Sequence, residues 1–466
     1  MAAAPPSLHL VIFPYMAQGH TIPLLDISKA FAIRGLKVII ITTPSNASFI
    51  VSKTSKHPNI SLSIIPFPRV PELPEGCENT ADLPSMALLS TFVEATKKMK
   101  QPFEGVLIDM IAYGHSPICV ISDFFLSWTL DSCRSFGIPR IVFHGMGALS
   151  MAICKSLTLL PLRTKPSLEL DLIELPNLKL PFTLQKADIP EGLLDFDPND
   201  HFARIIVETG EADINSWGVL VNSFEELEGD YVGAFESFYF NNAKAYCLGP
   251  FFLYNELKQE VKAQKVQMQS YSYIKWLEKQ AGFDGRTVIY VSFGTQAHLS
   301  KDQLDEIAFG LEMAAHPFIW VVRSRTWAAP KGGKERVKEK ELVLHDWADQ
   351  RSILSHPAIG GFLSHCGWNS MLESISMGVP LLAWPMLAGL MIPHRGDGGK
   401  KIMTVGRDVI CNRVRELMGG EKGRKAREKA QALGRKARVA VEKCGSSDKK
   451  LDQLIDQLSN NKNGKS

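Results

Sequence analysis

The chain has 466 residues, of which 45% are hydrophobic and 22% charged, and its 52 basic side chains nearly balance 49 acidic ones. This composition is globular, so it excludes collagen, coiled coil and wholesale disorder, and the length predicts more than one domain. A net charge of +3 provides no field that would recruit nucleic acid or an anionic membrane. The eight cysteines form no CxxC pair and are too sparse for a disulfide framework, which favours reduced cytoplasmic thiols.

Two apolar stretches bear on targeting. No basic segment precedes the first apolar run, so we interpret that run as a strand rather than a signal peptide. The uncharged stretch 378–393 is shorter than the roughly 20 residues that span a bilayer, and three prolines interrupt it. We therefore expect a soluble, cytoplasmic protein without membrane insertion.

The first half of the chain alternates strands and helices. An apolar run at 9–15 is followed by helical periodicity at 21–34, and a second apolar run occupies 37–43. Further strands are predicted at 60–66, 118–123, 140–144 and 219–222. This order predicts an α/β domain with a doubly wound parallel sheet.

The alternation restarts in the second half. Strands are predicted at 287–293, 317–322, 359–364 and 379–384, and helices at 301–314 and 370–376. Residues 402–405 and 408–411 are poor strand candidates, and 412–458 is helical in composition. Sheets commonly have about five or six strands, so about four convincing ones predict that part of this sheet is missing. The basic run 422–443 favours a solvated helix over a nucleic-acid patch.

Two polar residues follow strands of the first half. His20 lies where the first strand meets a helix, and a neutral imidazole there can take a proton from a hydroxyl. Asp123 ends the strand 118–123, and because strand ends converge on one edge, it is predicted to hydrogen-bond to His20 and stabilise its imidazolium. Structural roles stay open for both: a capping or buried histidine, and an N-cap for a helix starting near Leu126.

A second candidate site is the strand-to-helix turn Ser364–Ser370. Helix N-termini bind phosphate groups through backbone N–H groups and the helix dipole. His365, Asn369 and Ser370 add side-chain donors, and Glu373 lies one turn further on, placed to accept from ribose hydroxyls. The whole segment 347–385 resembles the signature box of the plant family 1 UDP-sugar-dependent glycosyltransferases.

The resemblance implies a GT-B fold, with two facing Rossmann-like domains, and an enzyme that transfers a sugar, glucose above all, from a UDP-sugar to a hydroxyl of a small lipophilic acceptor with inversion. Flavonoids and other plant phenolics are the acceptors that the family implies. His20 corresponds to the family's catalytic base and Asp123 to its partner. The implied donor contacts are Trp347 on uracil, Ala348 and Gln350 at the base and ribose, Glu373 at the ribose hydroxyls, Thr295, His365, Asn369 and Ser370 at the diphosphate, and Trp368 at the sugar. No metal or cofactor is implied beyond the UDP-sugar co-substrate, and we expect a monomer.

The composition, in particular the charged and Gln-rich stretch after residue 250, and the resemblance together predict the domains. Residues 1–250 are expected to form an N-terminal acceptor-binding domain, 251–275 a linker and 276–440 a C-terminal UDP-sugar-binding domain. Residues 441–466 are expected to form a C-terminal helix and tail that pack back on the N-terminal domain.

The box departs from the family pattern in two places. Asp349 replaces a proline, which is a mild change, and Gly389 and Leu390 replace an acidic residue and a glutamine that hold the sugar hydroxyls. Without these two hydrogen-bonding side chains, sugar binding would be weaker by about 2–4 kcal/mol. The alternative function is therefore a catalytically impaired relative that binds UDP or a small aromatic ligand without efficient transfer. An NAD-dependent oxidoreductase is excluded because no GxGxxG follows a predicted strand.

Overall fold

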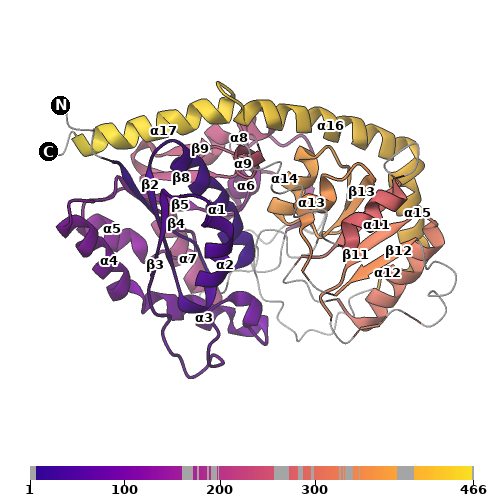
Figure 1. Cartoon of the computed structure of the whole chain (residues 1–466), viewed down its shortest axis with the longest axis horizontal. Helices are drawn as coiled ribbons and strands as arrows, with labels where there is room; N and C mark the ends of the chain where they lie inside the picture. The colour runs from indigo at the N-terminus through magenta and orange to yellow at the C-terminus, as the bar shows by residue number, and fades with distance from the viewer. Residues whose placement is uncertain are drawn as a thin grey trace. The chain divides into compact units, whose positions relative to one another are not determined.

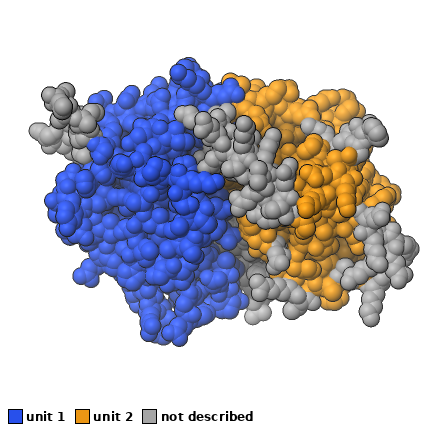
Figure 2. Space-filling model, viewed as in Figure 1, with its two compact units in different colours: residues 1–257, 440–466 blue, residues 258–439 orange. Residues whose placement is uncertain are grey.

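A computed structural model describes the chain in two compact units, residues 1–257 with 440–466 and residues 258–439 (Figure 2). The described residues are 7–159, 172–175, 178–185, 188–189, 197, 199–256, 272–281, 287–294, 299–324, 327–328, 330, 340–345, 347–385 and 404–463. Each unit contains its own parallel sheet and its own hydrophobic core.

The first unit is built on a seven-stranded parallel sheet with the order β3-β2-β1-β4-β5-β8-β9 (Figure 1). Its strands are β1 (His9–Phe13), β2 (Lys37–Thr42), β3 (Ile60–Ile64), β4 (Cys119–Asp123), β5 (Arg140–Phe143), β8 (Gly218–Val221) and β9 (Lys244–Cys247). Every residue of β1 and β4 is buried, because helices cover both faces at the centre of the sheet. A separate antiparallel pair joins β6 (Leu172–Ile173) to β7 (Leu184–Gln185).

The helices of the first unit follow the predicted alternation. They are α1 (Gln18–Ile33), α2 (Pro44–Thr54), α3 (Leu89–Lys97), α4 (Lys100–Ala112), α5 (Thr129–Ser135), α6 (Ala148–Leu159), α7 (His201–Ile214), α8 (Glu225–Glu236), α9 (Leu253–Glu256) and α17 (Ser446–Asn463), with 3-10 turns η1 (Thr80–Asp82), η2 (Met86–Leu88) and η4 (Phe240–Asn242). Helix α1 begins at Gln18 rather than at residue 21, so His20 belongs to its first turn.

The C-terminal helix α17 packs against β9 (Figure 1). Its apolar stripe, Leu451, Leu454 and Leu458, is buried. Near its start, the Ser447 hydroxyl donates to the carbonyl oxygen of Gly249 at 2.6 Å. The end of the chain therefore contributes to the core of the first unit.

The structure differs from the predicted linker at 251–275. Residues 251–254 are buried, and α9 contacts α1. The charged, Gln-rich composition begins only after Tyr254, so the apolar residues before it extend the first core. Residues 257–271 lie outside the described part of the chain, and residues 272–280 form helix α11.

The second unit contains a five-stranded parallel sheet with the order β12-β11-β10-β13-β14. Its strands are β10 (Val288–Ser292), β11 (Phe318–Val321), β12 (Glu341–Leu344), β13 (Ile359–Ser364) and β14 (Leu381–Ala383). The expected number of about four strands was one too low, because β12 is a half-buried edge strand without a continuous apolar run. The altered segment after β14, with Gly389 and Leu390, lies outside the described residues.

Helices flank this second sheet. They are α11 (Ser272–Gln280), α12 (Lys301–Ala314), α13 (Gln350–Leu354), α14 (Trp368–Ser376), α15 (Arg407–Gly419) and α16 (Glu421–Val441). Residues 408–411, a poor strand candidate, lie in α15. The basic run lies mostly in α16, where Ala430 and Ala437 are buried, as expected for a solvated helix with one apolar stripe. Among all the described helices, none is long and apolar enough to cross a membrane.

Helices α12 and α15 approach closely at Gly310. A Cβ atom at this position would lie 2.7 Å from Cβ of Ile410 and 3.0 Å from the carbonyl oxygen of Arg407. Overpacking of this kind costs about 1–3 kcal/mol. Gly310→Ala should therefore lower the free energy of unfolding of the second unit by about that amount, measured by urea denaturation. The control Gly419→Ala adds a methyl group that meets nothing within 4 Å, and it should be neutral or stabilising; equal effects of the two variants would contradict the prediction.

Candidate functional site

The first site lies where β1 and β4 end. His20 Nδ1 is 2.7 Å from Oδ2 of Asp123, so the predicted hydrogen bond is present. The Asp123 side chain is 0% exposed and that of His20 19% exposed. Among the described residues, no hydrogen-bond partner contacts Nε2 of His20. The pair therefore has a buried carboxylate behind the imidazole and an imidazole nitrogen available for a ligand.

Asp123 also orders its own turn. Its second carboxylate oxygen accepts a hydrogen bond from the backbone N–H of Phe125 at 3.1 Å. The N-cap role considered for Asp123 is wrong, because α5 begins at Thr129 rather than near Leu126 and has no side-chain cap. The carboxylate of Asp123 therefore both fixes the turn after β4 and orients the imidazole of His20.

Aromatic rings surround the imidazole of His20. Its ring centroid lies 5.7 Å from that of Tyr15 and 5.8 Å from that of Phe125. This burial by itself lowers the pKa of His20, but the charge and hydrogen bond of Asp123 outweigh it and raise the pKa above the ordinary value of 6.5. The pair is thus suited to take up a proton and to hold the imidazolium that results.

In the second unit, the turn between β13 and α14 forms a cradle around His365. Cβ atoms at Gly294 and Gly367 would lie 2.6 Å and 2.4 Å from Nε2 of His365, so only glycine fits on either side of the ring. Gly367 is the N-cap of α14 and gives the helix no side-chain cap. Burial lowers the pKa of His365, and its Nδ1 is buried with no partner among the described residues. A neutral imidazole beside a helix N-terminus is an arrangement that suits an anionic ligand.

Helices α13 and α14 bring a polar cluster together beside this turn. Gln350 Nε2 donates to Oγ of Ser370 at 3.0 Å and to Oε2 of Glu373 at 2.8 Å. Tyr290 donates to Oε1 of Gln350 at 3.3 Å. Gln350 therefore connects two other predicted donor-site residues, Ser370 and Glu373.

Arg351 belongs to the same cluster and was missed by the sequence analysis. Its Nε donates to Oε1 of Glu373 at 2.7 Å. The two residues are 22 positions apart in the sequence, so only the packing of α13 on α14 pairs them. The sequence offered one hint of this role: Arg351 is a basic residue that directly follows the predicted donor-site residue Gln350.

The other predicted site residues are placed individually. Trp347 is exposed and Ala348 buried, and Trp368 and Asn369 open α14. At the position where the family has proline, the backbone N–H of Asp349 donates to the Tyr273 hydroxyl at 3.3 Å. Proline has no N–H and could not make this hydrogen bond. Thr295 lies outside the described residues, as do Gly389 and Leu390. Within the described ranges, no cluster of three His, Cys, Asp or Glu side chains is arranged to hold a metal ion.

Comparison with known proteins identifies the family. The family model for "UDP-glucoronosyl and UDP-glucosyl transferase" matches residues 261–405. UDP-glycosyltransferase 90A1 of Arabidopsis thaliana is 36% identical over 476 residues, which cover 97% of this chain and 96% of the relative. The chain belongs to the plant UDP-glycosyltransferases. Scopoletin glucosyltransferase of Nicotiana tabacum is likewise 36% identical, over 97% of this chain and 98% of its own length.

Solved structures support the same assignment. The enzyme UGT73P12 of Glycyrrhiza uralensis, in complex with glycyrrhetinic acid 3-O-monoglucuronide, aligns with a TM-score of 0.85 and 27% identity over 99% of this chain and 97% of its own. UGT2 of Phytolacca americana, in complex with UDP-2-fluoro-glucose and pterostilbene, aligns with a TM-score of 0.77 and 27% identity over 97% of this chain and 100% of its own. The glycosyltransferase therefore has the GT-B fold, with two Rossmann-like domains built on parallel sheets.

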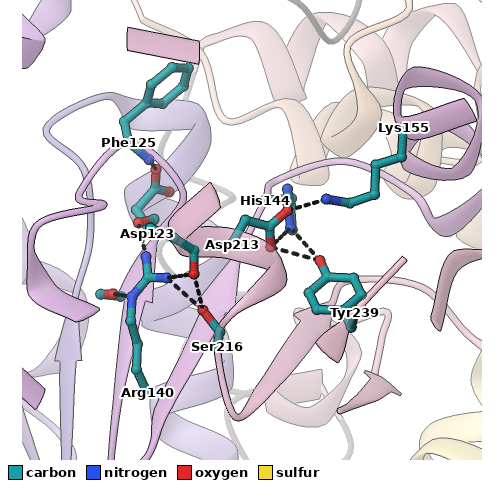
Figure 3. Close-up of polar contacts among 10 residues, drawn as sticks. Asp123, Phe125, Arg140, His144, Lys155, Asp213, Ser216 and Tyr239 are labelled. Atoms are coloured by element: carbon teal, nitrogen blue, oxygen red, sulfur yellow. Dashed lines mark hydrogen bonds and ion pairs between the residues drawn. The ribbon is translucent and has the colours of Figure 1, made fainter. Parts of the chain in front are cut away.

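A buried guanidinium supports Asp123 of the glycosyltransferase from below (Figure 3). Arg140 is buried, and its donors reach acceptors on three segments. Nε donates to Oγ of Ser122 (2.8 Å) and Oγ1 of Thr129 (3.0 Å), Nη1 to Oγ of Ser216 (2.7 Å), and Nη2 to the carbonyl oxygen of Asp123 (3.2 Å). Arg140 therefore fixes the backbone from which the carboxylate of Asp123 projects.

A second buried charge lies close by, on α7 (Figure 3). Asp213 forms an ion pair with Lys155, accepts a hydrogen bond from the Tyr239 hydroxyl at 2.7 Å and lies 3.0 Å from Nε2 of His144. Burial raises the pKa of Asp213, but the electrostatic interactions and hydrogen bonds with His144 and Lys155 outweigh it and hold that pKa well below its ordinary value. The ring of His144 lies against Phe124, at 5.0 Å between centroids, so this cluster also supports the turn after β4.

The depressed pKa of Asp213 predicts a pH-dependent stability. A carboxyl group with a folded-state pKa below its unfolded value of about 3.9 stabilises the fold above that pH, and the contribution is lost as the pH falls further. Asp213→Asn should cost about 3 kcal/mol at pH 7, because Lys155 loses its buried partner, and should flatten the loss of stability below about pH 4. Urea denaturation at pH 7 and between pH 4 and 3 measures both effects. Glu211→Gln, at an exposed position of the same helix, is the control and should change neither; identical curves for the two variants would refute the prediction.

Proposed function

We propose that this glycosyltransferase transfers glucose from UDP-glucose to a hydroxyl group of a small lipophilic acceptor, such as a flavonoid or another plant phenolic, with inversion at the anomeric carbon. The observation that carries the proposal is the hydrogen bond of 2.7 Å between His20 and the buried Asp123. The names of two relatives support the acceptor class: the tobacco scopoletin glucosyltransferase and the UDP-glucose flavonoid 3-O-glucosyltransferase 7 of Fragaria ananassa, 34% identical over 97% of this chain and 96% of its own length.

In the proposed mechanism, Nε2 of His20 takes the proton of the acceptor hydroxyl. The negative charge of Asp123 stabilises the imidazolium that forms, and the hydrogen bond at Nδ1 keeps the ring in the required tautomer. The acceptor oxygen attacks the anomeric carbon from the face opposite the diphosphate. A carbon–oxygen bond to the acceptor forms, the bond to the diphosphate breaks, and UDP leaves, so a single displacement inverts the configuration.

The second unit would bind the donor. In this proposal the ribose hydroxyls contact Glu373, with Gln350 beside them, and Trp347 and Ala348 contact the uracil. The diphosphate is held by Thr295, His365, Asn369, Ser370 and the N-terminus of α14, and the sugar is contacted by Trp368. Protein donors would then stabilise the charge that develops on the leaving UDP, so we expect no metal ion or further cofactor to be required, and a monomer suffices.

The surroundings of His20 support a lipophilic acceptor. The rings of Tyr15 and Phe125 lie against the imidazole, and the ring of Phe124 packs against Phe125. Among the described residues, no charged side chain other than Asp123 forms a hydrogen bond or ion pair with the imidazole. Aromatic surfaces pack well against flat phenolic rings. An acceptor of this class would place its hydroxyl at His20 while its rings stay out of water.

A second candidate function rests on the sequence at the end of the signature box. Gly389 and Leu390 have no side-chain hydrogen-bonding groups where the family has an acidic residue and a glutamine. A chain that keeps the side chains for the nucleotide but has none for the sugar hydroxyls would bind UDP and transfer sugar inefficiently.

Substitution of the base tests the principal proposal. His20→Ala should reduce turnover with UDP-glucose and a phenolic acceptor, such as scopoletin or quercetin, by about 10²–10⁴. Product formation can be followed by mass spectrometry. The control His201→Ala changes an exposed histidine of the same unit and should leave turnover unaltered. Unchanged turnover in His20→Ala, with any hydroxyl acceptor, would reject the assignment of the base.

The pH profile tests the partner of the base. The imidazole must be neutral to accept a proton, so kcat/KM should rise with pH through an apparent pKa above 6.5, the ordinary value from which the Asp123 carboxylate raises the pKa of His20. Asp123→Asn removes that negative charge. We expect it to move the acidic limb to lower pH while reducing the maximal rate. A limb that stays in place would show that Asp123 does not act on the base.

Titration of the donor separates the two candidate functions. Calorimetry with UDP and UDP-glucose should show that UDP binds well and, if no side chain holds the sugar hydroxyls, that the glucose moiety adds little affinity. In that case Gly389→Asp combined with Leu390→Gln should raise both the preference for UDP-glucose and the transfer rate. Glucose transfer by the unchanged chain at rates ordinary for its family would exclude the impaired function.

A further inference from the structure

Arg351 is the cation in contact with the carboxylate of Glu373. Its Nε donates to Oε1 at 2.7 Å, while Nε2 of Gln350 donates to Oε2 at 2.8 Å. The side chain of Glu373 is 9% exposed and that of Arg351 28% exposed. Each carboxylate oxygen thus has a donor from α13, and the two donors together fix the plane of the carboxylate on α14.

This geometry leaves acceptor capacity on both oxygens. An ionised carboxylate has about four lone-pair sites. With the donors of Arg351 and Gln350 in place, one site on each oxygen remains available. Two neighbouring hydroxyl groups, such as those of a ribose, are a ligand that can donate to both oxygens of one carboxylate.

We propose that Arg351 is a positioning residue for ribose recognition: its guanidinium holds Glu373 in the orientation in which both carboxylate oxygens accept from the 2′- and 3′-hydroxyls of the UDP-sugar. The inference rests on the proposed role of Glu373 as the ribose acceptor and extends it to a residue that itself need not touch the nucleotide. It predicts that Arg351 affects the affinity for nucleotides that carry these hydroxyls and leaves the affinity for the same nucleotides without them nearly unchanged.

The energetics favour an effect on binding over an effect on folding. The Arg351 side chain is 28% exposed, so solvent screens its ion pair with Glu373, and losing it should cost less stability than losing a fully buried pair. Without Arg351, however, the nearly buried carboxylate keeps the neutral amide of Gln350 as its side-chain donor from α13. It is then less firmly oriented toward a diol, and a hydrogen bond to a charged group depends strongly on its geometry.

The test is a comparison of UDP with 2′,3′-dideoxy-UDP, which lacks both hydroxyls. Calorimetric titration of the full chain should show that the wild type prefers UDP by at least about 100-fold, as expected for two hydrogen bonds to a carboxylate. In Arg351→Leu we expect this preference to fall by about 10-fold or more, through weaker binding of UDP. In Arg351→Lys we expect a partial recovery, because the ammonium keeps the charge but lacks the fixed guanidinium geometry.

The matched control is Arg407→Leu, which removes an ion pair with Glu306 that joins α15 to α12 in the same unit. It should leave the preference for UDP unchanged. Equal losses of affinity for both nucleotides in Arg351→Leu, or no loss for either, would overturn the inference while leaving the proposed function intact. If Arg351→Leu does not fold, the test depends on Arg351→Lys, and a wild-type preference for UDP in that variant would also overturn the inference. A wild-type chain that does not bind UDP would overturn the proposed function and this inference together.

Discussion

The arrangement of the first unit depends on one desolvated negative charge. The carboxylate of Asp123 is fully buried at the end of β4, and a buried charge is tolerated only when donors satisfy it. The imidazole of His20 and the backbone N–H of Phe125 do so directly, and Arg140 holds the backbone of Asp123 from the neighbouring strand. The imidazole comes from α1 and Arg140 from β5, so Asp123 has all of these contacts only when α1, β4 and β5 are packed together. The contacts that stabilise this part of the core are therefore also the ones that orient the imidazole.

The second unit also contains a carboxylate with little access to water, but donors surround it in a different geometry. The carboxylate of Glu373 is nearly buried and is held by Gln350 and Arg351, both from α13. Here the carboxylate has no imidazole to orient and keeps acceptor capacity for a ligand. Beside it, the glycines on both sides of His365 allow the ring to approach the N-terminus of α14. The first unit thus places a negative charge behind an imidazole, and the second holds a carboxylate and an imidazole beside a helix N-terminus.

The elements that the sequence predicted poorly share a physical cause. The strands at the centre of each sheet, such as β1 and β10, are buried on both faces and read as continuous apolar runs. The edge strands β9 and β12 have only four residues each; β9 begins with the exposed Lys244, and β12 is half-buried along its whole length, so neither shows a clear strand pattern. The start of α1 was placed too late because Gln18 and Gly19 carry no apolar periodicity, although they form its first turn. Periodicity reports contrast in burial, and it gives no signal where burial is uniformly intermediate, as in β12.

The sequence by itself determined the α/β class and the positions of the main strands along the chain, and the segment 347–385 indicated the family. It also predicted the pairing of His20 with Asp123, because strand ends in a parallel sheet converge on one edge. It also contained Gln350, Ser370 and Glu373, the residues of the polar cluster in the second unit, at the family's spacings. Only the tertiary structure decided which groups support these residues: Arg140 beneath Asp123, Asp213 between Lys155 and His144, and Arg351 against Glu373. Local spacing cannot specify such contacts, because each joins side chains that are distant in the chain and become neighbours only when separate elements pack.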